Sequence, residues 1–366
     1  MVHYVDDYAS IEPPYTIQSG FDCVHHLMKT IGFKFKPSKD QPPAKEQHIQ
    51  GVIMTISETS FTVATDPART QRITAQLHEI MDRGTMSSDE AHRLAGKLQF
   101  LSEAMFSQAI RCCIQPLYAR ASAPVQHAQI PLGDGIRDAL QTVLMILPNA
   151  RPRIFQFFQS PCSIVYADAY FQAGDEKINL STALKRQDWH TDATNLLTNG
   201  WGFVIRRPNQ ECYYAHGAIP GYLLGRFTTR RAFIYALEII AQLLCLVAGK
   251  PYMENKSLCF IDNEPGKFAL QKGYGRDTKV NRLLAFLWQF VESSNHEPHW
   301  ERVTSQANIS DAISRGDLSQ ATALGWKRIE FDWCALYHTL DLATSSMEKA
   351  MHLGASLATP PDTTGG

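Results

Sequence analysis

Two acidic residues in the second half of the chain stand at the ends of strand-like runs. Asp168 ends the run 163–168, and Asp262 ends the run 258–262. Ligands of open α/β sheets gather at the carboxyl ends of the strands, so these two carboxylates are well placed for metal or phosphate chemistry. Taken singly, Asp168 could simply end a strand and Asp262 could open a turn.

Glu238 carries the strongest single signal in the sequence. It lies in the stretch 233–241, which has helical character and is otherwise almost entirely apolar. A buried carboxylate is costly to desolvate without a cation, so we favour a metal ligand over a side chain that reaches water or pairs with Arg231. A fourth acid, Asp311, is better explained in isolation as a helix N-cap.

A further acidic pair, Asp6 and Asp7, stands in an aromatic and β-branched run near the first residue. Such a run favours a tight hairpin whose tip could hold a divalent cation. An exposed Asp-Asp turn would give the same pattern, and the pair alone does not decide between the two.

The elements that must position the four later acids follow from periodicity and from turn residues. Strands and helices are predicted in the order of three strands, a helix, a strand, a helix and a strand. Their ranges are 163–168, 200–205 and 211–215 for the strands, 229–248 for the helix, then 258–262, 278–293 and about 300–304. The fold class expected is α/β and α+β, with a mixed sheet in this half.

The first half is predicted to be a small mixed region followed by helices. The stretch 23–28 has helical spacing, 31–35 and 50–54 read as strands, and residues 66–121 read as helical. Asp66 and Gly84 would bound the first helix of that segment, and Ser87 with Glu90 would form a capping box for the second. A linker is expected at 126–159, and a disordered tail is expected from about residue 355.

Composition restricts the kinds of partner. The net charge is −1, which argues against a basic coat and leaves only a local patch for nucleic acid. The 8 cysteines form no Cys-x-x-Cys pair, which favours reduced thiols in the cytoplasm or nucleus and gives no zinc site. No signal peptide is expected, and the apolar run 239–249 is too short to span a bilayer.

The run Tyr-Val-Asp-Asp at 4–7 resembles the motif that carries two metal-binding aspartates in reverse transcriptases. The order that follows it resembles the end of a polymerase palm, with Lys39 near the incoming nucleotide, and the run 94–100 resembles the thumb or connection of retrotransposon polymerases. The resemblance implies a chain that lacks the upstream polymerase half, and therefore an incomplete polymerase site. That missing half is one expected partner.

The four later acids, in this order and on these elements, resemble the metal ligands of ribonuclease H, and the run 308–315 is similar to the last motif of the retrotransposon form. The resemblance implies two Mg²⁺ or Mn²⁺ ions held by Asp168, Glu238, Asp262 and Asp311, and cleavage of the RNA strand of an RNA–DNA hybrid. The domains expected are 1–60 palm, 61–125 thumb or connection, 126–159 linker, 160–330 ribonuclease H-like, and 331–366 a helix and tail. Basic residues expected to contact nucleic acid are Arg230, Arg231, Lys267, Lys272, Arg276 and Lys279, with Arg226 and Arg282 nearby; a solvated basic face explains them equally well.

Two departures from the family pattern bear on this hypothesis. Tyr170 is bulky where the family usually has a small residue, and no histidine stands in the loop before Asp311. The insertion 172–199 has no counterpart. The competing hypothesis is a non-catalytic remnant that binds nucleic acid or a polymerase partner. No membrane partner is expected.

Overall fold

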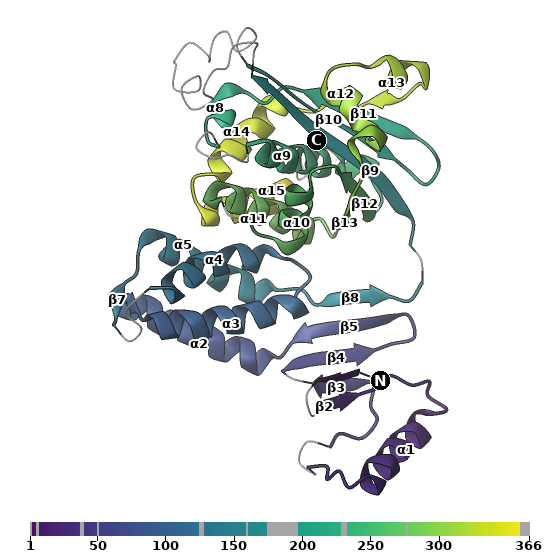
Figure 1. Ribbon diagram of the computed structural model, residues 1–366, viewed down its shortest axis with the longest axis vertical. Helices are drawn as coiled ribbons and strands as arrows, with labels where there is room; N and C mark the ends of the chain where they lie inside the picture. The colour runs from purple at the N-terminus through teal and green to yellow at the C-terminus, as the bar shows by residue number, and fades with distance from the viewer. Residues whose placement is uncertain are drawn as a thin grey trace, which may run out of the picture.

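The chain folds into a mixed α/β structure made of helices and several β-sheets. The computed structural model describes residues 2–4, 7–36, 40–49, 51–123, 128–158, 160–173, 197–227, 233–275 and 277–358. In Figure 1 the larger sheet with its own helices lies at one end of the longest axis and helix α1 at the other, with the bundle of helices and the small sheet side by side between them.

Both strands of the hairpin predicted at the first residues are present. Strands β1 (Val2–Tyr4) and β2 (Asp7–Ala9) pair antiparallel, with Tyr4 opposite Asp7. The tip residues, Asp6 among them, lie outside the described residues, as does Lys39, and of Asp7 only the backbone is described.

Helix α1 (Ile17–Thr30) contains the predicted helical stretch 23–28. The strand predicted at 31–35 is wrong. Gly32 adopts a φ of +84°, and the Phe33 N–H donates to the Met28 carbonyl, so these residues close the helix instead of extending. Alternating Phe and Lys residues gave the correct period for a strand but had no neighbouring strand to pair with.

A four-stranded antiparallel sheet has the order β3-β4-β5-β8. Its strands are β3 (Glu46–Ile49), β4 (Val52–Ile56), β5 (Ser60–Thr65) and β8 (Arg153–Gln156). Strand β4 confirms the strand predicted near residue 52, whereas β8 comes from the range 126–159 that we predicted to be a linker. The same range also contains β7 (Ile130–Pro131), helix α5 (Asp134–Ile146) and the short helix η2 (Leu147–Asn149).

Helix α5 shows why the linker prediction was wrong over its described residues. It buries Ile136, Leu140 and Val143 at the spacing of one helix face, against the neighbouring bundle. The proline and alanine content on either side of α5 concealed this apolar period in the sequence.

The bundle that α5 joins consists of α2 (Pro67–Arg83), α3 (Ser88–Ala104) and α4 (Ala109–Ala121). The predicted caps are confirmed. The Asp66 side chain accepts from the Ala68 N–H, Gly84 ends α2 in the left-handed conformation, and Ser87 and Glu90 form the capping box.

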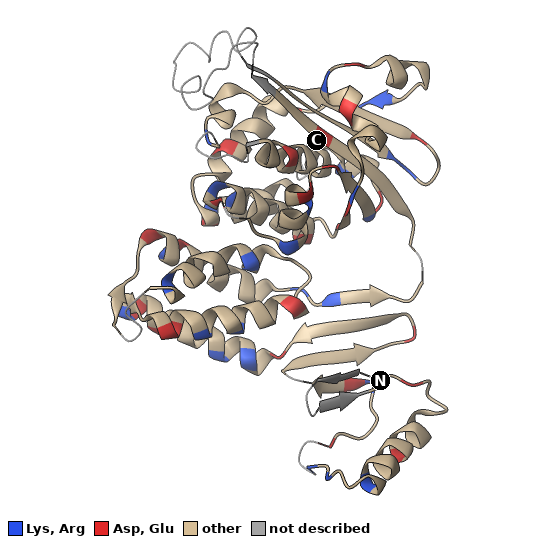
Figure 2. Cartoon of the chain, viewed as in Figure 1, with Lys and Arg blue, Asp and Glu red and all other residues tan. Residues whose placement is uncertain are grey.

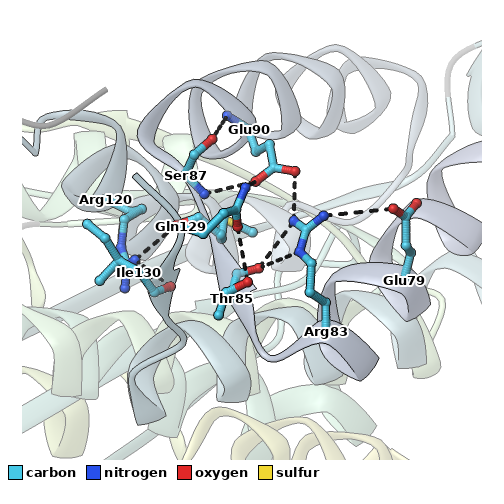
Figure 3. Close-up of polar contacts among 9 residues, drawn as sticks. Glu79, Arg83, Thr85, Ser87, Glu90, Arg120, Gln129 and Ile130 are labelled. Carbon is cyan, nitrogen blue, oxygen red and sulfur yellow. Dashed lines mark hydrogen bonds and ion pairs between the residues drawn. The ribbon is translucent and has the colours of Figure 1, made fainter. Parts of the chain in front are cut away.

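Glu90 also joins separate parts of the bundle, as Figure 3 shows. Its carboxylate accepts from the Ser87 backbone N–H at 2.9 Å, from Gln129 at 2.8 Å and from Arg83 at 2.7 Å. Arg83 is the last residue of α2, and Gln129 directly precedes β7. Strand β7 pairs with β6 (Thr85–Met86). Burial opposes ionisation of Glu90, but these hydrogen bonds outweigh it and lower the pKa to about 2, so the carboxylate holds the junction throughout the neutral range.

The larger sheet has the strand order β13-β12-β9-β10-β11-β14. Its strands are β9 (Cys162–Ala173), β10 (Leu197–Arg206), β11 (Cys212–Gly217), β12 (Lys256–Ile261), β13 (Glu297–Arg302) and β14 (Lys327–Arg328). Strands β9, β10 and β11 run antiparallel, whereas β12 pairs parallel with both β9 and β13. The predicted strands are therefore present, although β9 continues past Asp168 and β13 begins three residues earlier than expected.

The helices that follow the first three strands include the two predicted ones, α9 (Phe233–Gly249) and α11 (Thr278–Ser293). The other elements are α8 (Gly221–Leu224), η4 (Lys250–Tyr252), α10 (Glu264–Lys272), η5 (Ser305–Ala307), α12 (Ser310–Ser314), α13 (Ser319–Ala323), α14 (Trp333–Ala343) and α15 (Met347–Ala358). The single helix expected after residue 331 is thus two helices, and residues 355–358 of the expected tail belong to α15. Residues 359–366 lie outside the described part.

Helix α9 is the longest apolar segment of the described chain. The stretch Ile234–Tyr252 is long and apolar enough to cross a membrane by length and composition alone, so the apolar run exceeds the one judged from sequence. However, most of this stretch is buried inside the protein, which makes it weak evidence for a membrane span. Its buried residues belong to the main core cluster.

The helical bundle packs directly onto the domain of the larger sheet. The Ser107 hydroxyl donates to the Trp288 carbonyl at 3.2 Å, and the Arg151 guanidinium donates to the Glu292 carbonyl at 2.8 Å. The Cys112 thiol donates to the Gly273 carbonyl at 2.6 Å. Side chains from both groups also share one apolar core cluster.

Strand β10 separates two cores, because its alternating side chains face opposite sides of the sheet. Trp201 and Phe203 belong to the main core, whereas Val204 packs in a smaller cluster with Ile313 of α12. Gly202 lies on the α12 side, where a β-carbon would stand 2.7 Å from the Ile313 carbonyl carbon and would overlap the Ser314 backbone nitrogen. The absence of a side chain therefore lets the backbone of α12 rest on the strand.

We expect Gly202→Ala to lower the free energy of unfolding by about 1–3 kcal/mol, because a methyl group there must push α12 away from β10. Gly96→Ala is the matched control: this glycine lies inside α3 with nothing within 4 Å of its β-carbon position, so it should raise stability by about 0.5–1 kcal/mol. Urea unfolding of both variants measures the difference. Equal effects in the two variants would contradict the close packing described for α12.

Candidate metal centre

The register between β9 and β12 brings Asp168 and Asp262 together. The last paired residues of this parallel ladder are Tyr166 and Phe260, and β12 ends at Ile261. Asp168 stands two residues after Tyr166, and Asp262 stands two residues after Phe260. Asp168 is therefore inside β9, not at its end as predicted, but it lies just beyond the point where β12 stops pairing with β9. The expectation of acids at a shared carboxyl edge holds for this pair.

Helix α9 supplies the third carboxylate. Glu238 is 3 % exposed, in agreement with its apolar surroundings in the sequence, and its Oε2 atom has no hydrogen-bond partner among the described residues. Gln242, one turn later, is equally buried but fully used: its amide donates to the Phe260 carbonyl at 2.9 Å, and its oxygen accepts from the Trp300 indole at 3.2 Å. Gln242 therefore fixes α9 against β12 and β13, while Glu238 is left with an unpaired oxygen.

The three carboxylates form one group that could hold a metal ion. Each of Asp168, Glu238 and Asp262 offers an oxygen, and these oxygens lie within 4.8 Å of one another. A buried carboxylate oxygen without a hydrogen bond is costly, and a cation bound by all three groups would remove that cost. The donor set consists of oxygens only, which suits a hard divalent cation better than zinc, for which nitrogen and sulfur ligands are usual.

Burial and mutual repulsion both disfavour the charged forms of the two inner acids. Burial, together with the charges of Asp262 and Asp311, raises the pKa of Asp168 to about 7 despite a hydrogen bond from Ser314. Burial, followed by the charges of Asp168 and Asp262, raises the pKa of Glu238 well above its ordinary value. Both carboxylates therefore bind protons unusually firmly when no cation is present.

Two residues of the run 308–315 hold the Asp168 carboxylate from both sides. The Asn308 amide donates to its Oδ1 atom at 3.2 Å, and the Ser314 hydroxyl donates to its Oδ2 atom at 2.6 Å. Similarly, the Ser305 hydroxyl donates to Asp262 Oδ2 at 2.7 Å. Sequence reasoning gave none of these residues a role in the site. The spacing of Asn308 and Ser314 around Asp311 was visible, but their contact with Asp168 required the fold.

The fourth predicted ligand, Asp311, is not a member of the three-carboxylate group found among the described residues. Its carboxylate instead accepts from Arg315, with distances of 3.0 and 3.2 Å. Nor is Asp311 an N-cap, because Ile309 occupies that position before α12. Asp311 nevertheless lies close enough for its charge to raise the pKa of Asp168, so it borders the group without joining it.

The predicted nucleic-acid-binding residues divide into three sets. Arg230, Arg231 and Arg276 lie outside the described residues. Lys279 donates to the Arg226 carbonyl at 2.8 Å and so supports the chain. Lys267 and Lys272 both stand over the exposed ring of Phe268 on α10, at 5.4 and 5.2 Å from its centre.

Two neighbouring residues considered for the same surface have structural roles. Arg226 binds Asp341 through two bonds, at 2.6 and 2.9 Å, and Arg282 donates to the Thr344 carbonyl. Along α2 and α3, Figure 2 shows basic and acidic residues interspersed, so these two helices carry no basic coat.

No model of a known protein family matches the chain, and no curated protein sequence matches it significantly. A function for this chain therefore has to rest on the geometry of its described residues.

We expect Glu238→Gln to stabilise the metal-free protein at pH 8 by about 1–3 kcal/mol, because the wild type must either bury a charge that Asp168 and Asp262 repel or take up a proton on folding. The pKa of Glu238 is raised on folding, so the wild type loses stability as the pH rises above the ordinary carboxyl pKa. The glutamine variant does not titrate and keeps that stability. The gain should therefore shrink to within about 0.5 kcal/mol at pH 4, where this carboxyl is protonated in both states.

Urea unfolding in a chelator at the two pH values measures this pH dependence. Glu330→Gln is the control, because that side chain is 83 % exposed and should change stability by less than about 0.5 kcal/mol at either pH. A stabilisation by Glu238→Gln that is the same at pH 4 and pH 8 would contradict the repulsion described here.

Proposed function

We propose that this chain is a divalent-metal nuclease that hydrolyses the RNA strand of RNA–DNA hybrids, with a ribonuclease H-like domain at residues 160–330 and an origin in a retroelement reverse transcriptase. The observation that carries the proposal is the group of Asp168, Glu238 and Asp262, with a buried Glu238 oxygen that no described residue pairs by a hydrogen bond. A structural ion pair would leave no such oxygen, whereas a metal centre requires one.

The order of elements supports the proposed domain. Three antiparallel strands are followed by α8 and α9, by the parallel strand β12, by helices and by the parallel strand β13. This is the order that the resemblance to ribonuclease H implies, with acids on the first strand, the first helix and after the fourth strand. The helical bundle and the hairpin upstream are compatible with the proposed thumb and palm remnant.

The chemistry requires a nucleophile, a leaving group and a way to manage charge beside a phosphate. A water oxygen forms a bond to phosphorus while the bond to the leaving ribose oxygen breaks. The attacking water gives a proton to solvent, and the leaving oxygen takes a proton from solvent. Two Mg²⁺ or Mn²⁺ ions, when bound, would lower the pKa of the attacking water and stabilise the leaving oxygen.

Each acid of the site would have its own part in this chemistry. Asp168 would bridge the two ions, held in position by Asn308 and Ser314. Glu238 and Asp262 would complete one ion site, and Asp311 would complete the other. Because Asp168 and Glu238 bind protons when metal is absent, metal binding should release protons and should strengthen as the pH rises.

Lys272, which stands over the exposed Phe268, is the described residue best suited to hold a nucleic acid on this domain; Lys267 stands over the same ring but also pairs with Glu301 at 3.5 Å. Exposed aromatic rings accept base or sugar stacking, and ammonium groups neutralise phosphates. Helix α10, which carries all three, begins directly after Asp262 and Asn263, so this surface starts at the metal centre.

We expect the wild type to cleave a labelled RNA–DNA hybrid in Mg²⁺ and to leave a DNA duplex intact. Asp262→Asn should reduce the cleavage rate by at least about 100-fold, because the metal group loses a charged ligand. Mn²⁺ should raise the melting temperature of the wild type and should leave that of Asp262→Asn unchanged.

The matched control for this experiment is Asp317→Asn, since Asp317 is an exposed carboxylate that accepts a hydrogen bond from the Ser319 backbone N–H. It should cleave at the wild-type rate. Cleavage that is equal in the wild type and in Asp262→Asn would overturn the proposal. Hybrid binding without cleavage in any metal would support the competing hypothesis of a non-catalytic remnant.

A further inference from the structure

Arg315 is the one basic side chain that the described structure places in direct contact with an acid of the proposed active site. Its Nη2 and Nε atoms donate to Asp311 at 3.0 and 3.2 Å. The Arg315 side chain is 53 % exposed, and that of Asp311 is 38 % exposed, so the pair lies at the mouth of the site. Asp311 is the acid that the three-carboxylate group does not include.

The local backbone explains why this pair forms. Residues 311, 314 and 315 fall on one side of a single helical turn, because positions three and four apart are neighbours on a helix. Ser314 points to Asp168, and Arg315, the next residue, reaches back to Asp311. This helical turn therefore supplies a hydrogen-bond donor to Asp168, through Ser314, and a counter-charge to Asp311, through Arg315.

Tyr170 gives Arg315 a second contact. The guanidinium carbon lies 5.0 Å from the centre of the Tyr170 ring, within the range of a cation–π interaction. The ring has room because its cross-strand neighbour is Gly200, where a β-carbon would stand 2.5 Å from the ring edge. The bulky residue after the first acid, which departs from the family pattern, thus has a defined partner.

A cation at Asp311 and the guanidinium of Arg315 cannot share the same carboxylate without strong repulsion between two positive charges. In the structure the guanidinium contacts both oxygens of Asp311. The group of Asp168, Glu238 and Asp262 has no such competitor among the described residues. One ion position is therefore open, and the other is closed by a side chain of the protein.

We propose that Arg315 occupies the second cation position at Asp311 and leaves it for a phosphate of the substrate, so that the second ion binds only with nucleic acid present. This inference rests on the proposed function. A phosphate attracts Arg315 because the planar guanidinium matches two phosphate oxygens as well as it matches a carboxylate. The arriving phosphate and the arriving ion have opposite signs, so the phosphate offsets part of the charge that the ion adds.

The first test counts bound Mn²⁺ by electron paramagnetic resonance, with the full chain and without nucleic acid. We expect one bound ion per wild-type chain and two per Arg315→Ala chain, with the affinity for the second ion raised at least about 5-fold. Arg315→Gln should also bind two ions. The same result in two different variants would not come from misfolding of one of them. The control is Arg328→Ala, which removes an exposed arginine paired with Glu330 and should bind one ion.

The second test measures hybrid binding by fluorescence anisotropy in Ca²⁺ over a range of salt concentrations. Loss of one phosphate contact in Arg315→Ala should weaken binding and should reduce the salt slope by about 1. Arg315→Lys should retain most of that slope. A structural role for Arg315 would instead weaken both metal binding and hybrid binding.

The outcomes separate this inference from the proposed function. A wild type that binds no ion and cleaves no hybrid would defeat the proposed function and this inference with it. A wild type that binds one ion and cleaves, together with an Arg315→Ala variant that also binds only one ion, would defeat this inference alone. Two ions bound to the wild type without nucleic acid would also defeat it.

Discussion

The structure around the larger sheet depends on the cost of holding three carboxylates together, of which Asp168 and Glu238 are buried and Asp262 is half-buried. Asp168 and Glu238 are 3 % exposed, and Asp262 lies within 4.8 Å of both through its nearest oxygen. Like charges at this distance, removed from water, raise one another's pKa. A fold keeps such a group only where the rest of the domain is stable enough to enforce it, and enzymes keep it where a cation or a reaction uses it.

Separate parts of the domain enforce that geometry. The parallel register of β9 and β12 sets Asp168 beside Asp262, and Gln242 fixes the helix that carries Glu238. On the other face of the sheet, Gly202 lets α12 approach β10 until Ser314 reaches Asp168. A strand, a buried amide and a glycine therefore each contribute a constraint, and none of them is itself an acid.

Local physical chemistry explains which sequence predictions succeeded. The caps of α2 and α3, from Asp66 to Glu90, depend on residues within a few positions of one another, and both are confirmed. The errors occurred where a distant partner decides the outcome. Residues 31–35 have the period of a strand but no strand beside them, and α5 was hidden in a range that composition described as a linker.

The sequence by itself determined that Glu238 is a carboxylate in an apolar helix and that Asp168 lies in a strand and Asp262 directly after one, because periodicity and burial follow from neighbouring residues. Only the tertiary structure decided that these three converge and that Asp311 is not a member of their group. The reason is that convergence depends on strand register and helix packing between segments up to 94 positions apart, from 168 to 262, and no local pattern encodes such distances.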